Sequence, residues 1–555
     1  MKILVVSPRW FIGDIVNYRY MFPLGLAYIA AVLKKDGYDV DVLNLNHYPG
    51  PVDSIIKSVL SRKQYDHVLT GGISTFLNQI KAVVTAVRKI NPDINIIVGG
   101  GVVSSEPELI YDYLKPTYGI IGEGEKTVSE LIACLAKKEP VHNVQGLIYR
   151  DPHGICIKTS PRLPIANIDL IPYPDFDAFE FDKYLDHMHP SDQYSYDLFD
   201  QPRAYPIICS RSCPYLCTFC FHPLGNKYRQ RSLGSIMAEL RQNVPRYKIN
   251  IVGIYDELFS NDRKRLLEFC DEMQAFTKTL PWDCRWGCQM RVDRVDDELL
   301  ARMKASGCYT ISYGFESYSL SVLKSMKKHI MPEQIKRAVD LTLKNEISIQ
   351  GNFIFGDVAE TRTTARTTLD FWKKHVEAGI ILSFINPYPG TEIYQKLVER
   401  GVIKNKIDFI SNHIFDIFNI SEKMSNNEFG RLWFEVMKAR ILNRIYAGHY
   451  ALRAGENGTV SIKVTCPHCH NEIEYHNYYV LSRKVLFLMF YCRACRRRFY
   501  VGSKIYRLVS FLLVVFAAVM PGFAYELFKR IWSFLKNHDP RFKDKGLLGR
   551  LSDNN

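Results

Sequence analysis

Residues 1 to about 140 alternate short apolar runs, rich in β-branched residues, with amphipathic stretches of helical period. Helical patterns begin near Leu24, Val52, Leu77 and Pro107, and a last one follows Lys126. Such alternation predicts an α/β fold with a parallel, doubly wound sheet of the Rossmann-like (flavodoxin-like) kind, which binds its ligand at the carboxyl ends of the strands. The expected strands are Ile3–Ser7, Val40–Asn44, His67–Ile73, Ile94–Val98 and Gly119–Ile121.

The loops that follow these strands are rich in glycine and small polar residues. Glycine at such a position lets a large ligand approach the backbone closely. We therefore expect a ligand site formed by Ser7-Pro8-Arg9, Gly72-Ile73-Ser74-Thr75, Gly99-Gly100-Gly101 and Gly122-Glu123-Gly124-Glu125.

A second alternating region runs from about Ala204 to Glu399, after an irregular connector rich in Pro, Asp and Tyr over residues 141–200. Strand–helix alternation of this kind favours a β/α barrel, whose reactive groups lie on loops at the carboxyl-terminal face. The expected strand ends carry Asp256-Glu257, Arg291, Glu316-Ser317, Gly351–Gly356 with Glu360-Thr361, and Asn386–Thr391.

Residues 401–460 read as an amphipathic helical region, and an apolar segment follows near the C-terminus. Leu508 to Tyr525 is apolar for 18 residues, interrupted only by Ser510, Pro521 and Gly522. At 1.5 Å per residue this is about 27 Å, enough for a thin bilayer. We expect a hydrophobic membrane segment here. A re-entrant or in-plane hairpin with Phe523–Leu535 and a buried interface helix are the alternatives.

The formal net charge of +14 over 555 residues does not form one long basic tract. Much of the excess flanks the apolar segment, so anionic lipid is the expected partner and no nucleic acid is expected. No signal peptide precedes the first strand, so we expect cytoplasmic catalytic domains attached to the inner face of the cell membrane. The flanking basic residues are Arg496, Arg497, Arg498, Lys504, Arg507, Lys529 and Arg530.

Three cysteines, Cys213, Cys217 and Cys220, form a Cys-x3-Cys-x2-Cys triplet on one short loop. Such a triplet can hold three corners of an iron–sulfur cube and leave one iron open for chemistry. A structural zinc loop with Cys209 or His222 as fourth ligand, or a set of buried thiols, is the alternative.

Two further Cys-x2-Cys pairs, Cys466/Cys469 and Cys492/Cys495, are separated by 22 residues. Four thiolates at this spacing predict a zinc ribbon, in which the metal stabilises a module too small to bury its own core. A rubredoxin-like iron site is the alternative. Of the other seven cysteines, which we expect to be buried thiols, Cys284 and Cys288 are close enough to leave a second cluster open.

The triplet, with Phe219 just before its last cysteine, resembles the radical S-adenosylmethionine (SAM) superfamily, and the strand-end motifs follow in that family's order. The resemblance implies a partial (β/α)6 barrel and a 4Fe-4S cluster whose open iron chelates SAM. It also implies that Asp256 and Glu257 contact the SAM ammonium group, Arg291 its carboxylate, and Glu316 with Ser317 the methionine part or the ribose. One departure is Val358-Ala359, where the family carries Pro-Gly before Glu-Thr.

The N-terminal part resembles the cobalamin-binding domain that precedes many radical SAM cores. The matching stretches are Phe22–Leu33, Val98-Gly99-Gly100 and Gly122–Glu125, and by this resemblance Ser7, Pro8, Leu24, Ser74, Thr75, Gly99, Gly100, Gly122, Glu123, Gly124 and Glu125 contact the corrinoid. The Asp-x-His-x-x-Gly motif that supplies an axial histidine is absent after the first strand. We interpret His47 as a surface loop histidine. A flavodoxin-like domain without cofactor is the alternative.

These observations predict six segments: a cobalamin-type domain (1–140), a connector (141–200), a radical SAM core (201–400), a helical region (401–460), a zinc ribbon (461–502) and a membrane-associated segment (503–555). The expected activity is cleavage of SAM to a 5′-deoxyadenosyl radical, with methylcobalamin-dependent methylation of an unactivated carbon on a lipid or other apolar small molecule. A one-electron donor such as flavodoxin or ferredoxin is the expected partner.

Two rival functions remain open from the sequence. One is radical cyclisation, rearrangement or carbon–carbon coupling without methyl transfer. The other is a non-catalytic, membrane-docked scaffold or sensor, which the intact set of Cys213, Cys217 and Cys220 argues against.

Overall fold

The computed structural model describes residues 1–519 except residues 12, 13, 15, 17, 194, 260 and 481–485. The chain forms two compact units, each assembled from segments distant in sequence. The first contains Met1–His187, Ser210–Ser235 and Asn386–Asp416, and the second contains Met188–Cys209, Ile236–Ile385 and the residues from Ile417 onward.

The first unit is built on a sheet whose strand order is β2-β1-β3-β4-β5-β6-β7. The first five strands in sequence are parallel, which confirms the predicted doubly wound, flavodoxin-like sheet. Their bounds agree with the apolar runs to within two residues: β1 (Lys2–Ser7), β2 (Asp39–Asn44), β3 (His67–Gly71), β4 (Asn95–Gly99) and β5 (Tyr118–Ile120).

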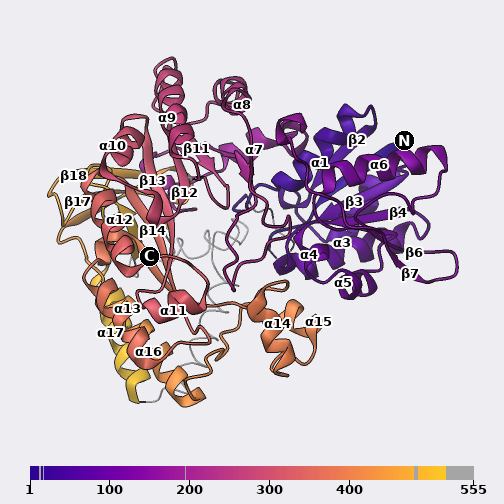
Figure 1. Cartoon of the computed structure of the whole chain (residues 1–555). Coiled ribbons are helices and arrows are strands. Elements are labelled where there is room, and N and C mark those ends of the chain that lie inside the picture. The colour runs from indigo at the N-terminus through magenta and orange to yellow at the C-terminus, as the bar shows by residue number, and fades with distance from the viewer. Residues whose placement is uncertain are drawn as a thin grey trace, which may run out of the picture. The chain divides into compact units, whose positions relative to one another are not determined.

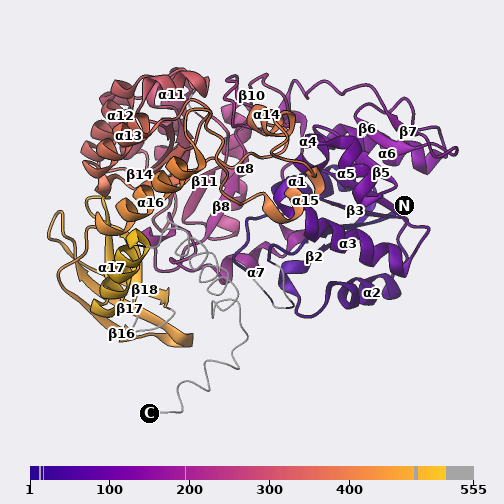
Figure 2. The ribbon, with the colours of Figure 1, turned by 90° about the horizontal axis from the view of Figure 1, so that it is seen from below.

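Helices cover both faces of this sheet (Figure 1). One face carries α1 (Leu24–Lys35) and α6 (Gly124–Lys137), and the other carries α3 (Leu77–Ile90), α4 (Gly101–Ser105) and α5 (Pro107–Leu114). A further helix, α2 (Val52–Arg62), lies beside α3 (Figure 2). α3 buries Leu77, Ile80, Val84 and Val87, the helical spacing that made its amphipathic pattern visible in the sequence.

The connector contains two strands that the sequence pattern did not indicate. β6 (Leu147–Arg150) and β7 (Cys156–Lys158) continue the sheet in antiparallel fashion beyond β5. They have only 4 and 3 residues, too few for a period of two to stand out. A short helix, α7 (Phe181–Asp186), follows and contributes Phe181 to a buried aromatic cluster with Phe22 and Phe176.

The second unit contains six parallel strands in the order β15-β14-β13-β12-β11-β8, which confirms the expected open, partial barrel. The strands are β8 (Ala204–Ile207), β11 (Ile251–Ile254), β12 (Arg285–Met290), β13 (Cys308–Glu316), β14 (Ser348–Phe355) and β15 (Ile380–Phe384). Helices alternate with them along the chain: α8 (Leu233–Arg246), α9 (Arg263–Thr277), α10 (Asp297–Ala305), α11 (Leu320–Ser325), α12 (Pro332–Lys344) and α13 (Arg362–Lys373).

The expected helical region is helical only in part. The region expected to be helical is residues 401–460. Helix α14 (Glu392–Glu399) ends just before it, α15 (Lys406–Asp408) lies near its start, and α16 (Asn426–Leu442) is its main helix. The described residues between 450 and 502 are mostly extended, because they pair in two small sheets that flank the second cysteine group. These strands are β16 (Tyr450–Ala454), β17 (Thr459–Thr465), β18 (Glu472–Tyr479), β19 (Phe487–Tyr491) and β20 (Arg498–Gly502).

The expected membrane segment is wrong for the described part of the chain, where no helix is long and apolar enough to cross a membrane. α17 (Lys504–Val519) has 16 residues and includes Lys504 and Arg507. The rest of the predicted apolar segment, Pro521, Gly522 and the stretch Phe523–Leu535 lie outside the described residues.

The burial of His67 leads to the first prediction, which concerns the pH dependence of stability. His67 begins β3, is 1% exposed, and neither ring nitrogen has a hydrogen-bond partner among the described residues. Burial lowers the pKa of His67, so below about pH 6.5 protons bind the unfolded chain more readily than the folded one. We expect stability to be complete above that pH and to decline below it.

Replacing His67 with leucine should reduce the loss of melting temperature between pH 7.5 and pH 5.5, measured by scanning fluorimetry. The same change at exposed His142 serves as the matched control. An unchanged pH dependence in the His67→Leu protein would show that other groups cause the acid sensitivity.

Candidate functional site

The three loop cysteines lie on a loop whose two ends are joined. β9 (Ser210–Arg211) pairs in antiparallel fashion with β10 (Arg229–Gln230), and residues 212–228 form the loop between them. The backbone N–H of Cys220 donates to the Cys217 carbonyl at 3.1 Å, which closes a tight turn. Cys217 is buried, whereas Cys213 and Cys220 are half-buried. We call residues 212–228 the cysteine loop.

The cysteine loop packs inside the first unit against a strand end of the corrinoid-type sheet. The ring of Phe221 lies against Gly101, which follows β4: a Cβ added at Gly101 would be 3.5 Å from the ring. On its other side the ring lies so close to Gly390 that a Cβ there would be 2.4 Å away. The Ile393 N–H donates to the Thr218 carbonyl at 3.1 Å.

Charged contacts fix the same loop at its base. Arg211 of β9 donates to Glu123 at 3.1 Å and to Glu125 at 2.6 Å. Arg229 of β10 donates to Glu123 at 2.7 Å and to the Ser212 hydroxyl at 3.1 Å. Sequence reasoning missed both arginines, although each lies within nine residues of a loop cysteine. The available signal was the Gly-Glu-Gly-Glu motif, because its two carboxylates need positively charged partners if they are buried.

The glycines after β3 and β4 allow two strand ends to approach without side chains between them. A Cβ added at Gly71 would lie 2.4 Å from the Gly99 carbonyl oxygen, and one at Gly100 (φ 89°) would lie 2.7 Å from that of Gly72. Gly122 has φ 79° and open space around it. Beside these glycines Ile73 is 56% exposed, unusual for a large apolar residue. A bare backbone cradle next to an apolar side chain fits a large, partly apolar macrocycle.

The other residues predicted to contact the corrinoid lie at the same edge of the sheet. Ser7 ends β1 and is buried, and Pro8 after it is half-buried. Leu24 is half-buried at the start of α1. Ser74 is buried with its hydroxyl 3.1 Å from that of Ser105, and Thr75 is half-buried.

His47 is not the surface histidine that we expected. Its side chain is fully buried, with Nδ1 2.9 Å from the Glu180 carboxylate and Nε2 2.7 Å from the Tyr20 hydroxyl. Burial lowers its pKa even though the Glu180 contact opposes this. The sequence interpretation failed because Glu180 is 133 residues away in the chain.

In the second unit, Asp256 and Glu257 follow β11. Asp256 is 1% exposed, and its Oδ1 accepts the backbone N–H of Cys209 at 2.7 Å. Cys209 directly precedes the strand that leads into the cysteine loop. Glu257 is exposed.

Arg291 follows β12 and has its donors engaged. Its guanidinium pairs with both carboxylate oxygens of Asp293, at 3.0 and 3.2 Å. It also donates to the carbonyls of Lys328 and His329, at 3.1 and 3.0 Å. This arrangement holds the turn that presents the Lys328 side chain.

Glu316 and Ser317 end β13. Glu316 has φ 62° and is buried, and its Oε1 accepts from Lys328 Nζ at 2.7 Å. The pair lies over Gly314, where an added Cβ would be 2.3 Å from Glu316 Oε1. Ser317 is 1% exposed and its hydroxyl lies 3.2 Å from that of Thr368. Lys328 was missed because its partner is 12 residues away across a turn.

The Glu360 turn forms despite the Val358-Ala359 departure from the family pattern. The Glu360 N–H donates to the Asp357 carbonyl at 2.9 Å, and the Thr364 hydroxyl donates to the Glu360 carboxylate at 2.7 Å. Burial raises the pKa of Glu360 to about 7.

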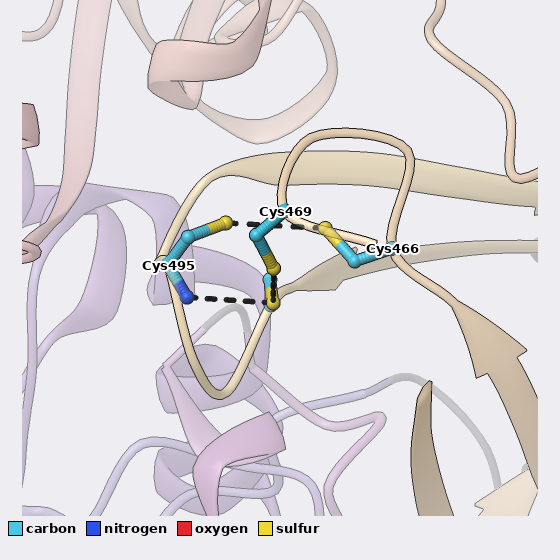
Figure 3. A group of neighbouring side chains, drawn as sticks. Cys466, Cys469 and Cys495 are labelled. Atoms are coloured by element: carbon cyan, nitrogen blue, oxygen red, sulfur yellow. Dashed lines mark hydrogen bonds between the residues drawn. The ribbon is translucent and has the colours of Figure 1, made fainter. Parts of the chain in front are cut away.

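A second cysteine group lies in the second unit. The sulfur atoms of Cys466, Cys469, Cys492 and Cys495 all lie within 4.8 Å of one another. The two Cys-x2-Cys turns face each other with their sulfurs pointing inward (Figure 3). Hydrogen bonds from Cys492 and then Cys495 lower the pKa of Cys466. Four convergent soft ligands suit a tetrahedral metal ion.

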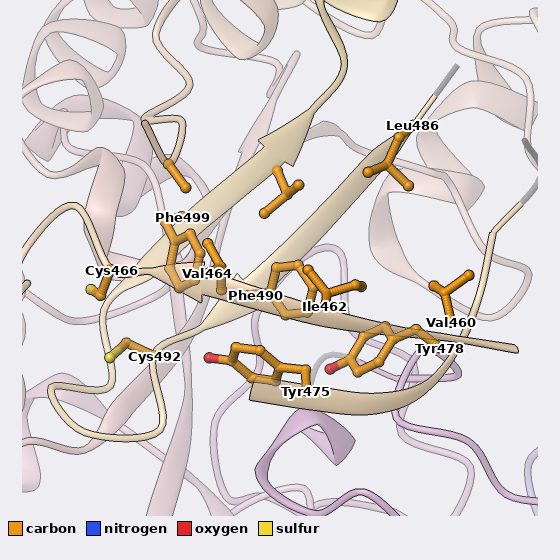
Figure 4. Close-up of a cluster of buried hydrophobic side chains, with 12 residues drawn as sticks. Val460, Ile462, Val464, Cys466, Tyr475, Tyr478, Leu486, Phe490, Cys492 and Phe499 are labelled. Atoms are coloured by element: carbon orange, nitrogen blue, oxygen red, sulfur yellow. The ribbon is translucent and has the colours of Figure 1, made fainter. Parts of the chain in front are cut away.

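Beside this group an aromatic core joins the two small sheets (Figure 4). Tyr475 of β18 lies against Phe490 of β19 with ring centroids 4.5 Å apart, and Tyr478 lies 5.0 Å from Phe490. Cys466 and Cys492 are both 0% exposed at one end of the cluster. Val460, Ile462 and Val464 belong to the same buried cluster.

A flavodoxin-like sheet with a bare glycine edge, a three-cysteine loop packed against that edge, and a six-stranded parallel sheet define an enzyme with two large cofactors. Two family models match the chain: the B12 binding domain over residues 15–132 and the Radical SAM superfamily over residues 207–371. The chain belongs to the cobalamin-dependent radical SAM enzymes, a methyltransferase-like class. The first model is named for B12 binding and the second for radical SAM chemistry.

Relatives agree with this assignment. An uncharacterised methyltransferase of Pyrococcus horikoshii is 28% identical over 388 residues, covering 69% of this chain and 79% of that protein. The anaerobic magnesium-protoporphyrin IX monomethyl ester cyclase of Rubrivivax gelatinosus is 24% identical over 408 residues, covering 72% of this chain and 70% of that protein.

Among solved structures, the radical SAM methyltransferase TsrM of Kitasatospora setae, with cobalamin and a 4Fe-4S cluster bound, has a TM-score of 0.59 at 20% identity. The match covers 72% of this chain and 75% of that chain. At this identity the likeness concerns the fold.

The glycine cradle gives the second prediction. Replacing Gly100 with alanine places a Cβ against the Gly72 carbonyl at a positive φ, a strain of about 1–3 kcal/mol. We expect cobalamin to bind about tenfold more weakly or worse, measured by equilibrium dialysis. Gly25→Ala is the matched control, because an added Cβ there meets nothing within 4 Å. Equal affinity in the two variants would remove the cradle from the corrinoid site.

Proposed function

We propose that this protein transfers a methyl group to an unactivated carbon of a small-molecule substrate. The single observation that carries this proposal is the packing of the cysteine loop, through Phe221, against the glycine edge of the B12-type sheet. When bound, the cluster and SAM supply a 5′-deoxyadenosyl radical and cobalamin supplies a methyl carrier. A one-electron donor such as flavodoxin or ferredoxin would serve the cluster.

In this proposal Cys213, Cys217 and Cys220 hold three irons and leave the fourth for SAM. Asp256 and Glu257 contact the SAM ammonium group, since a carboxylate makes a charge-assisted hydrogen bond with it. Glu316 and Ser317 contact the methionine part or the ribose, and Phe219 packs beside the cluster. Arg291 acts indirectly, because its guanidinium already holds Asp293 and the carbonyls of Lys328 and His329.

Ser7, Pro8, Leu24, Ser74, Thr75 and the glycines Gly99, Gly100, Gly122 and Gly124 line the corrinoid side in the same proposal. His47 does not replace the missing axial motif, because its ring is buried between Glu180 and Tyr20. The expectation of a lipid substrate depended on the membrane segment, and no helix of the described residues supports that segment.

Radical cyclisation without methyl transfer is the second candidate. The observation in its favour is the relative named as a cyclase, which this chain matches over 408 residues. The two candidates differ in products: methyl transfer yields S-adenosylhomocysteine and 5′-deoxyadenosine together, whereas cyclisation yields no S-adenosylhomocysteine.

The third prediction separates them. The anaerobically reconstituted protein, supplied with cobalamin, SAM, reductant and a lipid extract as the source of substrate, should form both products in comparable amounts, measured by chromatography with mass detection. Cys217→Ala should lower both by about a hundredfold or more, because a cluster with two thiolates is not held. Cys134→Ala, half-buried on α6, is the matched control. Neither product from wild-type protein with four irons per chain would overturn the enzyme proposal.

We also propose that Cys466, Cys469, Cys492 and Cys495 bind zinc in a structural ribbon. The ribbon contacts the amino ends of barrel strands: the Tyr491 hydroxyl donates to the Ile349 carbonyl at 3.0 Å, and Arg498 donates to the Ile380 carbonyl at 3.1 Å. The catalytic loops follow the opposite ends of these strands. The metal would therefore stabilise the barrel without contacting the loops that carry the proposed cofactor-binding residues.

The fourth prediction follows. Cys469→Ser should reduce bound zinc to below about one-tenth of the wild-type content and lower the melting temperature by about 5 °C or more, because metal binding and folding of such a module are coupled. Metal analysis by mass spectrometry and a thermal scan measure the two effects, with Cys156→Ser as control. Iron with a visible charge-transfer band would instead indicate the rubredoxin-like alternative.

A further inference from the structure

The carboxylates of the Gly122–Glu125 loop do not face an open ligand site. Glu123 and Glu125 are 6% and 7% exposed. Glu123 Oε1 accepts from both Arg211 and Arg229, and its Oε2 accepts the backbone N–H of Ile165 at 2.6 Å. Both oxygens of Glu123 are therefore engaged with protein. These protein contacts compete with the expected contact between the Glu123 carboxylate and the corrinoid.

The four charges form one buried cluster, which we call the Arg–Glu cluster: Glu123, Glu125, Arg211 and Arg229. Two positive and two negative groups balance, which is the condition for burying them. Burial alone would lower the pKa of Arg211, but Glu125 and Glu123 outweigh it and raise the pKa above its ordinary value. The Arg211 guanidinium also lies 5.4 Å from the centroid of the Tyr28 ring on α1.

The cluster joins two parts of the chain that carry different cofactor loops. Arg211 and Arg229 lie on β9 and β10, the two strands at the base of the cysteine loop. Glu123 and Glu125 lie between β5 and the first turn of α6. The 17-residue loop contains no other paired strand, so this base, the Phe221 contact and the hydrogen bond from the Ile393 N–H to the Thr218 carbonyl all help to place its cysteines.

We propose that Glu123, Glu125, Arg211 and Arg229 are positioning residues that fix the cysteine loop on the corrinoid-binding sheet, so that the two cofactors meet one substrate at a set distance. This inference rests on the proposed function. Displacements of about 1 Å at such a site lower rates by about a hundredfold. Arginine suits the role because its fork makes two directed hydrogen bonds to carboxylates.

The test uses the full-length protein carrying Glu125→Gln, which keeps the shape of the side chain and removes one charge. Glu123→Gln is the stronger variant, and Glu125→Gln keeps the test open if Glu123→Gln fails to fold. Glu108→Gln, at an exposed pair with Lys158 in the same sheet domain, is the matched control.

The first readout is hydrogen exchange before cluster and cobalamin are added. We expect peptides covering residues 210–230 to exchange about tenfold faster in Glu125→Gln than in wild type, with β12–β14 unchanged. The second readout is the product split after reconstitution, at equal iron content. We expect the ratio of S-adenosylhomocysteine to 5′-deoxyadenosine to change about fivefold or more, a shift that general destabilisation would not cause.

Wild-type exchange in residues 210–230 of both variants, together with an unchanged product ratio, would overturn the positioning role. A change in cobalamin affinity alone, without faster exchange, would also overturn it and return Glu123 and Glu125 to direct corrinoid contact. Failure of the proposed function is a different result: the wild-type protein would then form no S-adenosylhomocysteine while the exchange difference persisted.

Discussion

The geometry of the proposed site depends on the contacts that fix the cysteine loop, residues 212–228, to the rest of its compact unit. By sequence the loop follows β8 of the six-stranded sheet, but by packing it belongs to the compact unit built on the corrinoid-type sheet. The backbone alone cannot fix seventeen residues that lack internal strands. Two short strands, one aromatic ring between two glycines, and four buried charges supply that constraint. The chain thus uses specific contacts where a continuous core is absent.

Glycine and charge have complementary roles at this edge. Gly71, Gly99 and Gly100 remove side chains so that β3 and β4 approach closely, and Gly101 lets the Phe221 ring reach the backbone. These close van der Waals contacts are not directional, unlike hydrogen bonds. The Arg–Glu cluster adds direction, because each guanidinium has donors fixed in one plane. In Gly122–Glu125 the two residue types alternate: Gly122 has φ 79°, and Glu123 and Glu125 supply the two carboxylates.

The sequence predicted what repeats regularly and missed what pairs over long distance. The five parallel strands of the first sheet follow from apolar runs, because buried parallel strands are continuously hydrophobic. The strand ends of the second sheet were recognised from motifs that resemble the radical SAM family. β6 and β7 escaped because they have 4 and 3 residues. His47 with Glu180, and Arg211 with Glu125, are separated by 133 and 86 residues, and no local pattern encodes such pairs. The membrane segment was wrong for the described residues, where no helix is long and apolar enough to cross a membrane.

The ribbon illustrates a division of labour between the two ends of the barrel strands. Residues around the second cysteine pair bind backbone groups at the amino ends of β14 and β15, and the Tyr491 N–H donates to Asp197 at 2.6 Å just before β8. An open sheet has two edge strands, and β8 and β15 are those edges here. The ribbon therefore contacts one edge strand, β15, directly and the segment that leads into the other edge strand, β8. The carboxyl ends of the strands are left to the loops that carry the proposed cofactor-binding residues.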